Sequence, residues 1–166
     1  MARKKLGKTT IIAIGIRGAG YDAEWGGNFT VGTAEEHEGF RIAKESVLEY
    51  LSEYIKNNNI NGYVKFWISG YSRAAATANL VAAALDEGAN GYDYISSLNY
   101  GPEDVYAYTF ETPMPTRDKK TKDKLYTNIF NIINRIDYVP KVAPEVWEYS
   151  RYGMDCYLPS PETYGK

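Results

Sequence analysis

The residues with the clearest chemical potential are those at positions 70–74, which read Gly-Tyr-Ser-Arg-Ala. This Gly-x-Ser-x-small motif lies between a predicted buried strand and a predicted helix. A sharp strand-to-helix turn needs small residues two positions before and after the serine, here Gly70 and Ala74, and it raises the serine hydroxyl above the sheet. The pattern predicts that Ser72 is a nucleophile. The alternative is that Ser72 only caps the helix, because serine is a favoured N-cap residue.

The helix that follows the motif supplies a second chemical feature. The N–H groups and the dipole at a helix N-terminus favour negative charge, so the backbone N–H of Arg73 can help to stabilise an oxyanion. A serine hydroxyl attacks well only when a base takes its proton, and that base is usually a histidine oriented by a carboxylate. Asp137 follows a later predicted strand and is the candidate carboxylate, the alternative being an ordinary turn aspartate.

Hydrophobic periodicity predicts the elements that must position these residues. The predicted strands cover residues 9–16, 63–69, 105–109 and 128–133, and the predicted helices cover residues 35–56 and 73–85. The stretch at 89–104 is predicted to be a loop, and the chain from 142 onward is predicted to be irregular. This alternation predicts an α/β fold with a mostly parallel sheet and flanking helices, formed by residues 1–166 as a single domain. Ser72, Asp137 and residues 17–19 all follow carboxyl ends of strands, where such sheets bind ligands.

Composition limits the classes of partner. The chain is 44% hydrophobic and 24% charged with a net charge of −2, and it has no basic patch of the kind that binds nucleic acid. The basic runs at 3–5 and 117–124 are expected to be solvated. No apolar run is long enough for a membrane span or a signal peptide, so we expect a soluble protein. The single cysteine, Cys156, is expected to be half-buried and structural, and nothing predicts a metal site.

Six motifs follow the order found in the class 3 (fungal-type) lipases, and the sequence resembles bacterial members of that family over roughly residues 11–152. The motifs lie at residues 16–19, 24–25, 37–40, 70–74, 109–113 and 134–140. The resemblance implies an α/β-hydrolase fold, an ester or lipid substrate and no cofactor. It also implies that Ser72 is the nucleophile, that Asp137 is the triad acid, and that the N–H groups of Arg73 and Ala19 form the oxyanion hole.

The sequence departs from the family at the catalytic base. Its one histidine, His37, occupies the His-x-Gly-Phe position that the family uses structurally, and no histidine follows Asp137. Two explanations stay open. The chain is a C-terminally incomplete ester hydrolase, or it is a pseudo-hydrolase that uses the pocket for binding or interaction. In both cases catalysis by this chain alone should be weak, because only the oxyanion hole and binding remain.

A second departure is Glu111, which stands where the family usually has a small residue. Its carboxylate could repel an oxyanion or contact a polar substrate. The simpler expectation is that Glu111 is a rim residue that faces water.

Overall fold

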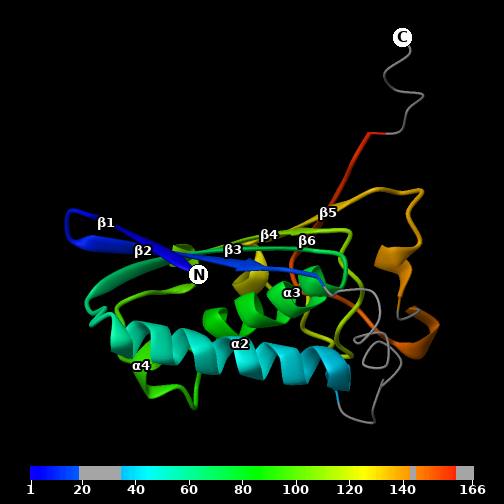
Figure 1. The fold of residues 1–166 in the computed structure, drawn as a ribbon. Coiled ribbons are helices and arrows are strands. Elements are labelled where there is room, and N and C mark those ends of the chain that lie inside the picture. The colour runs from blue at the N-terminus through cyan, green and yellow to red at the C-terminus, as the bar shows by residue number, and fades with distance from the viewer. Residues whose placement is uncertain (19–34, 143–144, 160–166) are drawn as a thin grey trace.

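A computed structural model describes residues 1–18, 35–142 and 145–159. Six strands form one sheet, which Figure 1 shows nearly edge-on, and their order in the sheet follows their order in the sequence. The strands are β1 (Ala2–Leu6), β2 (Thr9–Ile16), β3 (Tyr63–Tyr71), β4 (Val105–Phe110), β5 (Ile129–Ile133) and β6 (Met154–Tyr157). β1 is antiparallel to β2, and every other neighbouring pair is parallel. The predicted mostly parallel α/β architecture is therefore confirmed.

Three helices cover one face of this sheet in the described part of the chain: α2 (Glu38–Asn57), α3 (Arg73–Asp86) and α4 (Asp93–Ser96) (Figure 1). Short 3-10 turns occur at η1 (Pro102–Asp104), η2 (Lys124–Tyr126), η3 (Val139–Lys141) and η4 (Glu145–Trp147). Almost every residue of α3 is buried, because its alanines let the helix lie close to the sheet. None of the helices in residues 1–18, 35–142 and 145–159 is long and apolar enough to cross a lipid bilayer.

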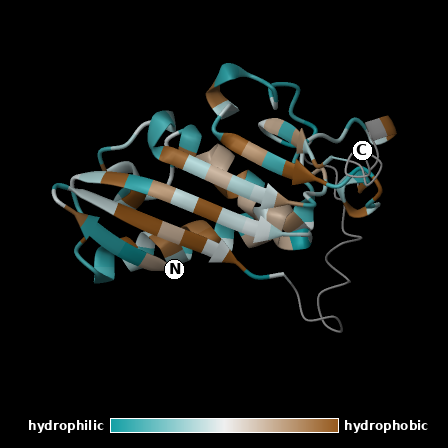
Figure 2. Cartoon of the chain, turned by 90° about the horizontal axis from the view of Figure 1, so that it is seen from above, coloured by the Kyte–Doolittle hydropathy of each residue, from teal (hydrophilic) through white to brown (hydrophobic). Residues whose placement is uncertain are grey.

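The strands alternate between a buried and an exposed face, as the pleat requires. On β3, Phe66 and Ile68 are completely buried, whereas Trp67 and Tyr71 are 56% and 62% exposed. β4 repeats the pattern, since Val105 is buried and Tyr108 is exposed. Figure 2 shows the resulting alternation of hydropathy along the strands. The core therefore lies between the sheet and the three helices, and the other face carries a set of exposed aromatic side chains.

The structure corrects three expectations from the sequence and confirms a fourth in part. The basic run at 3–5 is exposed, as expected of a solvated segment, but it lies in a strand, β1, that is held by pairing with β2. β6 lies in the region predicted to be irregular, and α4 lies in the stretch predicted to be a loop. Cys156 is exposed, so the expectation of a half-buried thiol is wrong. It lies on an edge strand, next in sequence to Asp155, which turns toward the helices, so Cys156 points to the uncovered face.

Candidate active site

The turn at Ser72 has the geometry of a strained strand-to-helix elbow. Ser72 joins β3 directly to α3 and has φ 57° and ψ −130°, a conformation that a non-glycine residue rarely adopts. An ideal Cβ at Gly70 would lie 2.5 Å from the carbonyl oxygen of Ala74, so only glycine fits at position 70. The Ser72 side chain makes no capping hydrogen bond to α3, although it precedes the helix. Ser72 is a partly exposed residue at the carboxyl end of β3.

The end of β2 lies beside this elbow. An ideal Cβ at Gly18 would be 3.6 Å from the carbonyl oxygen of Tyr71, so the segment that leads to Ala19 approaches the turn closely. Ala19 itself lies outside the described residues. Arg73 is the first residue of α3, where the helix dipole favours negative charge. The N–H of Arg73 is thus placed at the helix end that faces the carboxyl edge of the sheet.

Asp137 follows β5, which is separated from β3 by one strand, β4. It lies in a short turn whose backbone is fixed by two contacts. The Asp137 N–H donates to the carbonyl of Asn134 (3.1 Å), and the Asp137 Oδ1 accepts from the N–H of Val139 (2.9 Å). Because β3, β4 and β5 are parallel, Ser72 and Asp137 leave the same edge of the sheet.

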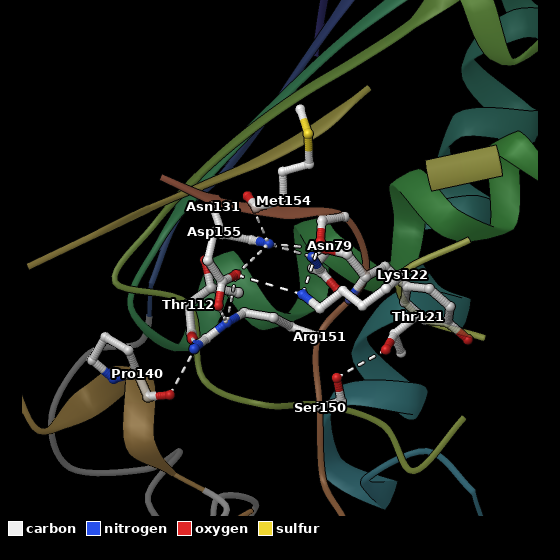
Figure 3. A network of polar contacts seen from close by, with 12 residues as sticks. Asn79, Thr112, Thr121, Lys122, Asn131, Pro140, Ser150, Arg151, Met154 and Asp155 are labelled. Atoms are coloured by element: carbon white, nitrogen blue, oxygen red, sulfur yellow. Dashed lines mark hydrogen bonds and ion pairs between the residues drawn. The ribbon is translucent and has the colours of Figure 1, made fainter. Parts of the chain in front are cut away.

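A buried polar network lies directly beneath this edge (Figure 3). The sheet register aligns Thr109, Asn131 and Asp155 in one row across β4, β5 and β6. The Thr109 hydroxyl donates to Asn131 Oδ1 (2.7 Å), and Asn131 Nδ2 donates to Asp155 Oδ1 (3.1 Å). From α3, the amide of Asn79 donates to Asn131 Oδ1 (3.0 Å) and accepts from the N–H of Tyr152 (3.0 Å). The network therefore joins the elbow helix to the three strands that follow it.

Arg151 extends the network to the loop that carries Asp137. Its guanidinium is buried, with Nε 3.1 Å from Asp155 Oδ1, and Nη1 donates to the backbone carbonyls of Thr112 and Pro140 (2.8 Å to Pro140). Figure 3 shows that these contacts converge on one side chain. Thr112 follows β4 and Pro140 follows Asp137, so one cation holds both loops. The sequence offered no local signal for this role, because the contacts of Arg151 lie up to 39 residues away.

His37 is the only histidine of the sequence, and it is buried. It precedes α2; its N–H donates to the carbonyl of Pro115 (2.8 Å), and its ring centroid lies 4.5 Å from that of Phe40 and 6.3 Å from that of Tyr149. These contacts with neighbouring aromatic rings are those of a structural residue at a helix start.

Glu111 does not simply face water, so that expectation is wrong. Its carboxylate is half-buried and accepts the backbone N–H of Asn134 with both oxygens, at 3.0 and 3.1 Å. Glu111 also has a positive φ of 51°. Its side chain is therefore occupied by the loop that leads to Asp137.

A surface cavity of about 370 Å³ lies between the η2 region and β6, lined among others by Lys122, Tyr126 and Asp155. Neither Ser72 nor Asp137 lines it. Burial lowers the pKa of the Lys122 ammonium, against the opposing effect of Asp155. Within the described residues no group of three or more His, Cys, Asp or Glu side chains is placed to hold a metal ion.

Comparisons with known proteins identify the fold and the family. The structure superposes on a fungal lipase solved as an inhibitor complex with a TM-score of 0.68 at 17% identity, covering 94% of this chain and 59% of that one. The triacylglyceride lipase of Rhizomucor miehei gives a TM-score of 0.62 at 18% identity, with the same coverage of 94% and 59%. The lipase of Rhizopus microsporus var. chinensis gives 0.63 at 16% identity, covering 93% of this chain and 54% of that one.

The chain thus spans less than two thirds of the length of these lipases, and at such identities the superpositions establish the shared α/β-hydrolase fold. A sequence comparison with the curated proteins found no match. The family model described as lipase (class 3) matches residues 14–147, which include both the Ser72 elbow and Asp137. Because this match covers most of the sequence, the chain belongs to the class 3 lipase family.

Proposed function

We propose that this chain is the core of a serine hydrolase that cleaves carboxylic esters, with lipid esters as its substrate class. The observation that carries the proposal is the strained Ser72 turn between β3 and α3 in a chain of the class 3 lipase family. Strain of this kind persists only where the surrounding structure enforces it, and it is common at active sites. Ser72 is partly exposed and its side chain does not cap α3, which supports the same role.

In the proposed reaction, Ser72 Oγ attacks the ester carbonyl carbon while its proton passes to a base. The N–H groups of Arg73 and Ala19 stabilise the oxyanion of the tetrahedral intermediate. The intermediate then collapses, the ester C–O bond breaks, and the alcohol leaves with the proton from the base. Water then attacks the carbonyl carbon of the acyl-serine and gives a proton to the base. The bond to Ser72 Oγ breaks, the acid is released, and Oγ regains its proton from the base. Asp137 orients the base and stabilises its charged form.

The base itself is the part that these 166 residues do not provide. The only histidine is His37, and its ring is buried against Phe40 and Tyr149. We therefore assign the triad histidine to a segment outside this sequence. Without it, the oxyanion hole and substrate binding should leave only a residual activity, several orders of magnitude below that of a complete triad.

A fluorophosphonate probe, which reacts with activated serines, tests the proposal. We expect labelling of the wild-type chain, loss of labelling in Ser72→Ala, and retained labelling in Ser69→Ala, a matched serine on β3 three residues earlier. Free imidazole should raise the labelling rate of the wild type and not that of Ser72→Ala, because it can replace the missing base. Equal labelling of wild type and Ser72→Ala, with and without imidazole and in a C-terminally longer form, would refute the proposal.

The missing base also favours a second candidate function, a non-catalytic binding or interaction domain on the same fold. The fold alone does not establish chemistry. The two candidates differ in turnover: hydrolysis of a short-chain ester by the chain, abolished in Ser72→Ala, excludes the binding-only function for the form tested.

A further inference from the structure

One peptide unit at the end of β4 contacts both neighbouring strands. The carbonyl of Phe110 accepts the N–H of Ser72 (2.9 Å), and the N–H of Glu111 donates to the carbonyl of Ile132 on β5 (3.0 Å). These two groups belong to the same peptide bond. The elbow that follows β3 is therefore linked to β5 through the Phe110–Glu111 peptide.

The Glu111 side chain extends this link to the loop that carries Asp137. Both carboxylate oxygens accept the N–H of Asn134, the first residue after β5. Asn134 in turn organises the turn: its carbonyl accepts the N–H of Asp137 (3.1 Å), and its Oδ1 accepts the N–H of Ile136 (3.2 Å). Hydrogen bonds to a charged acceptor are about twice as strong as neutral ones, so Glu111 holds the base of this turn firmly.

The strained backbone of Glu111 argues against an incidental contact between its carboxylate and the N–H of Asn134. A φ of 51° lies in the left-handed region, where glycine is favoured and a side chain adds strain. Glu148 provides a comparison within the same chain, because it also has a positive φ, of 64°. Its side chain is 70% exposed and pairs with Lys119 on the surface. At Glu111 the side chain is instead half-buried and bound to a backbone N–H beside the candidate acid.

We propose that Glu111 is a positioning residue, whose carboxylate fixes the Asp137 loop relative to the Ser72 elbow. The inference rests on the proposed hydrolase function, since it assigns a role within that reaction. Glu111 does not touch the reacting atoms. It acts through the N–H of Asn134 and through the peptide it shares with Phe110.

Three substitutions separate the carboxylate from the backbone conformation. Glu111→Ala removes the carboxylate and keeps the strain, Glu111→Gly removes both, and Glu111→Gln keeps an acceptor oxygen without the charge. We expect kcat for a short-chain ester, measured in a form that carries the triad histidine, to fall about ten- to hundredfold in the Ala and Gly variants. KM should change little, and Gln should restore part of the rate. Glu148→Ala and Glu148→Gly are the matched controls and should leave kcat unchanged.

The amide proton of Asn134 reports the contact independently of turnover. In the 166-residue chain, its NMR signal should lie downfield in the wild type and move upfield in Glu111→Ala, with Glu111→Gln in between. Unchanged kcat in the Ala and Gly variants, while Ser72→Ala abolishes activity, overturns the positioning role and leaves the hydrolase function intact. Activity that survives Ser72→Ala overturns the hydrolase function and with it the role of Glu111 in the reaction. An Asn134 signal that is the same in the wild type and in Glu111→Ala overturns the contact itself.

Discussion

Gly70 shows how the absence of a side chain makes the strained Ser72 turn possible. The strained Ser72 turn brings the first turn of α3 back over the end of β3, and the carbonyl of Ala74 then occupies the space that a Cβ at position 70 would need. The sequence predicted this requirement from the spacing of small residues around Ser72. It could not predict the use of Glu111, because the side chain binds Asn134, 23 residues later in the chain.

Gly70→Ala should therefore lower the free energy of unfolding by about 1 to 3 kcal/mol, the usual cost of overpacking. Gly15→Ala on β2 is the matched control, because an ideal Cβ there meets nothing within 4 Å. That control should change stability by less than about 1 kcal/mol, since a strand residue other than glycine loses less entropy on folding. Urea unfolding measures both values. If the two variants are equally stable, the close approach of Ala74 does not constrain position 70.

The elements that the sequence predicted well are those with an apolar pattern. β2 was predicted at its observed bounds, and α3 within one residue, because buried branched or small side chains mark them. The edge strands β1 and β6 were missed. Their residues are mostly exposed, and hydrogen bonding to a neighbouring strand holds them, which leaves no hydrophobic signal. The polar network was missed because no local pattern marks it. Asn79 lies in an alanine-rich helix, and its partners are 52 and 73 residues away in the sequence.

Among the contacts that join different elements, those of Arg151 should contribute most to the free energy of unfolding. Arg151→Met keeps much of the apolar stem but removes the donor to the carbonyls of Thr112 and Pro140 and breaks the ion pair with Asp155, which keeps its hydrogen bond from Asn131. Removing one member of a buried ion pair typically costs about 3 to 5 kcal/mol, and we expect that loss in the free energy of unfolding. Arg41→Met, which breaks the exposed pair with Glu45 on α2, should cost under about 0.5 kcal/mol. Comparable losses in chemical denaturation of the two variants would contradict a structural role for Arg151.

Across the molecule, α3 runs from the candidate site, at the carboxyl ends of the strands, to the opposite ends of the strands. Its N-terminus lies at Ser72, where the positive end of the dipole suits an oxyanion, and its last residue is Asp86, where the negative end disfavours a carboxylate. Asp86 is buried; its Oδ1 accepts from Asn128 Nδ2 (2.7 Å), and its Oδ2 has no hydrogen-bond donor among the described residues. Burial raises the pKa of Asp86 to about 7, helped by the charge of Glu87 and opposed by Asn128.

This carboxyl should make the stability of the whole chain depend on pH. The folded state holds the Asp86 proton up to a pKa of about 7, whereas the unfolded chain releases it near its ordinary value of 3.8. The stabilising contribution of the protonated form is thus complete below pH 3.8, and it is lost as pH rises to about 7. The loss should reach up to about 4 kcal/mol, at 1.36 kcal/mol for each pKa unit.

Asp86→Asn should remove this component, because an amide keeps the neutral form at every pH. We expect the stability of the variant relative to wild type to increase between pH 4 and pH 7 and to stay constant above, as measured by urea unfolding across that range. Asp93→Asn, at an exposed aspartate that begins α4, controls for the general loss of a negative charge. A difference between wild type and Asp86→Asn that stays constant from pH 4 to pH 8 would show that Asp86 is ionised in the folded protein throughout. In that case, α3 would accommodate a carboxylate at its C-terminus that burial and the helix dipole both disfavour.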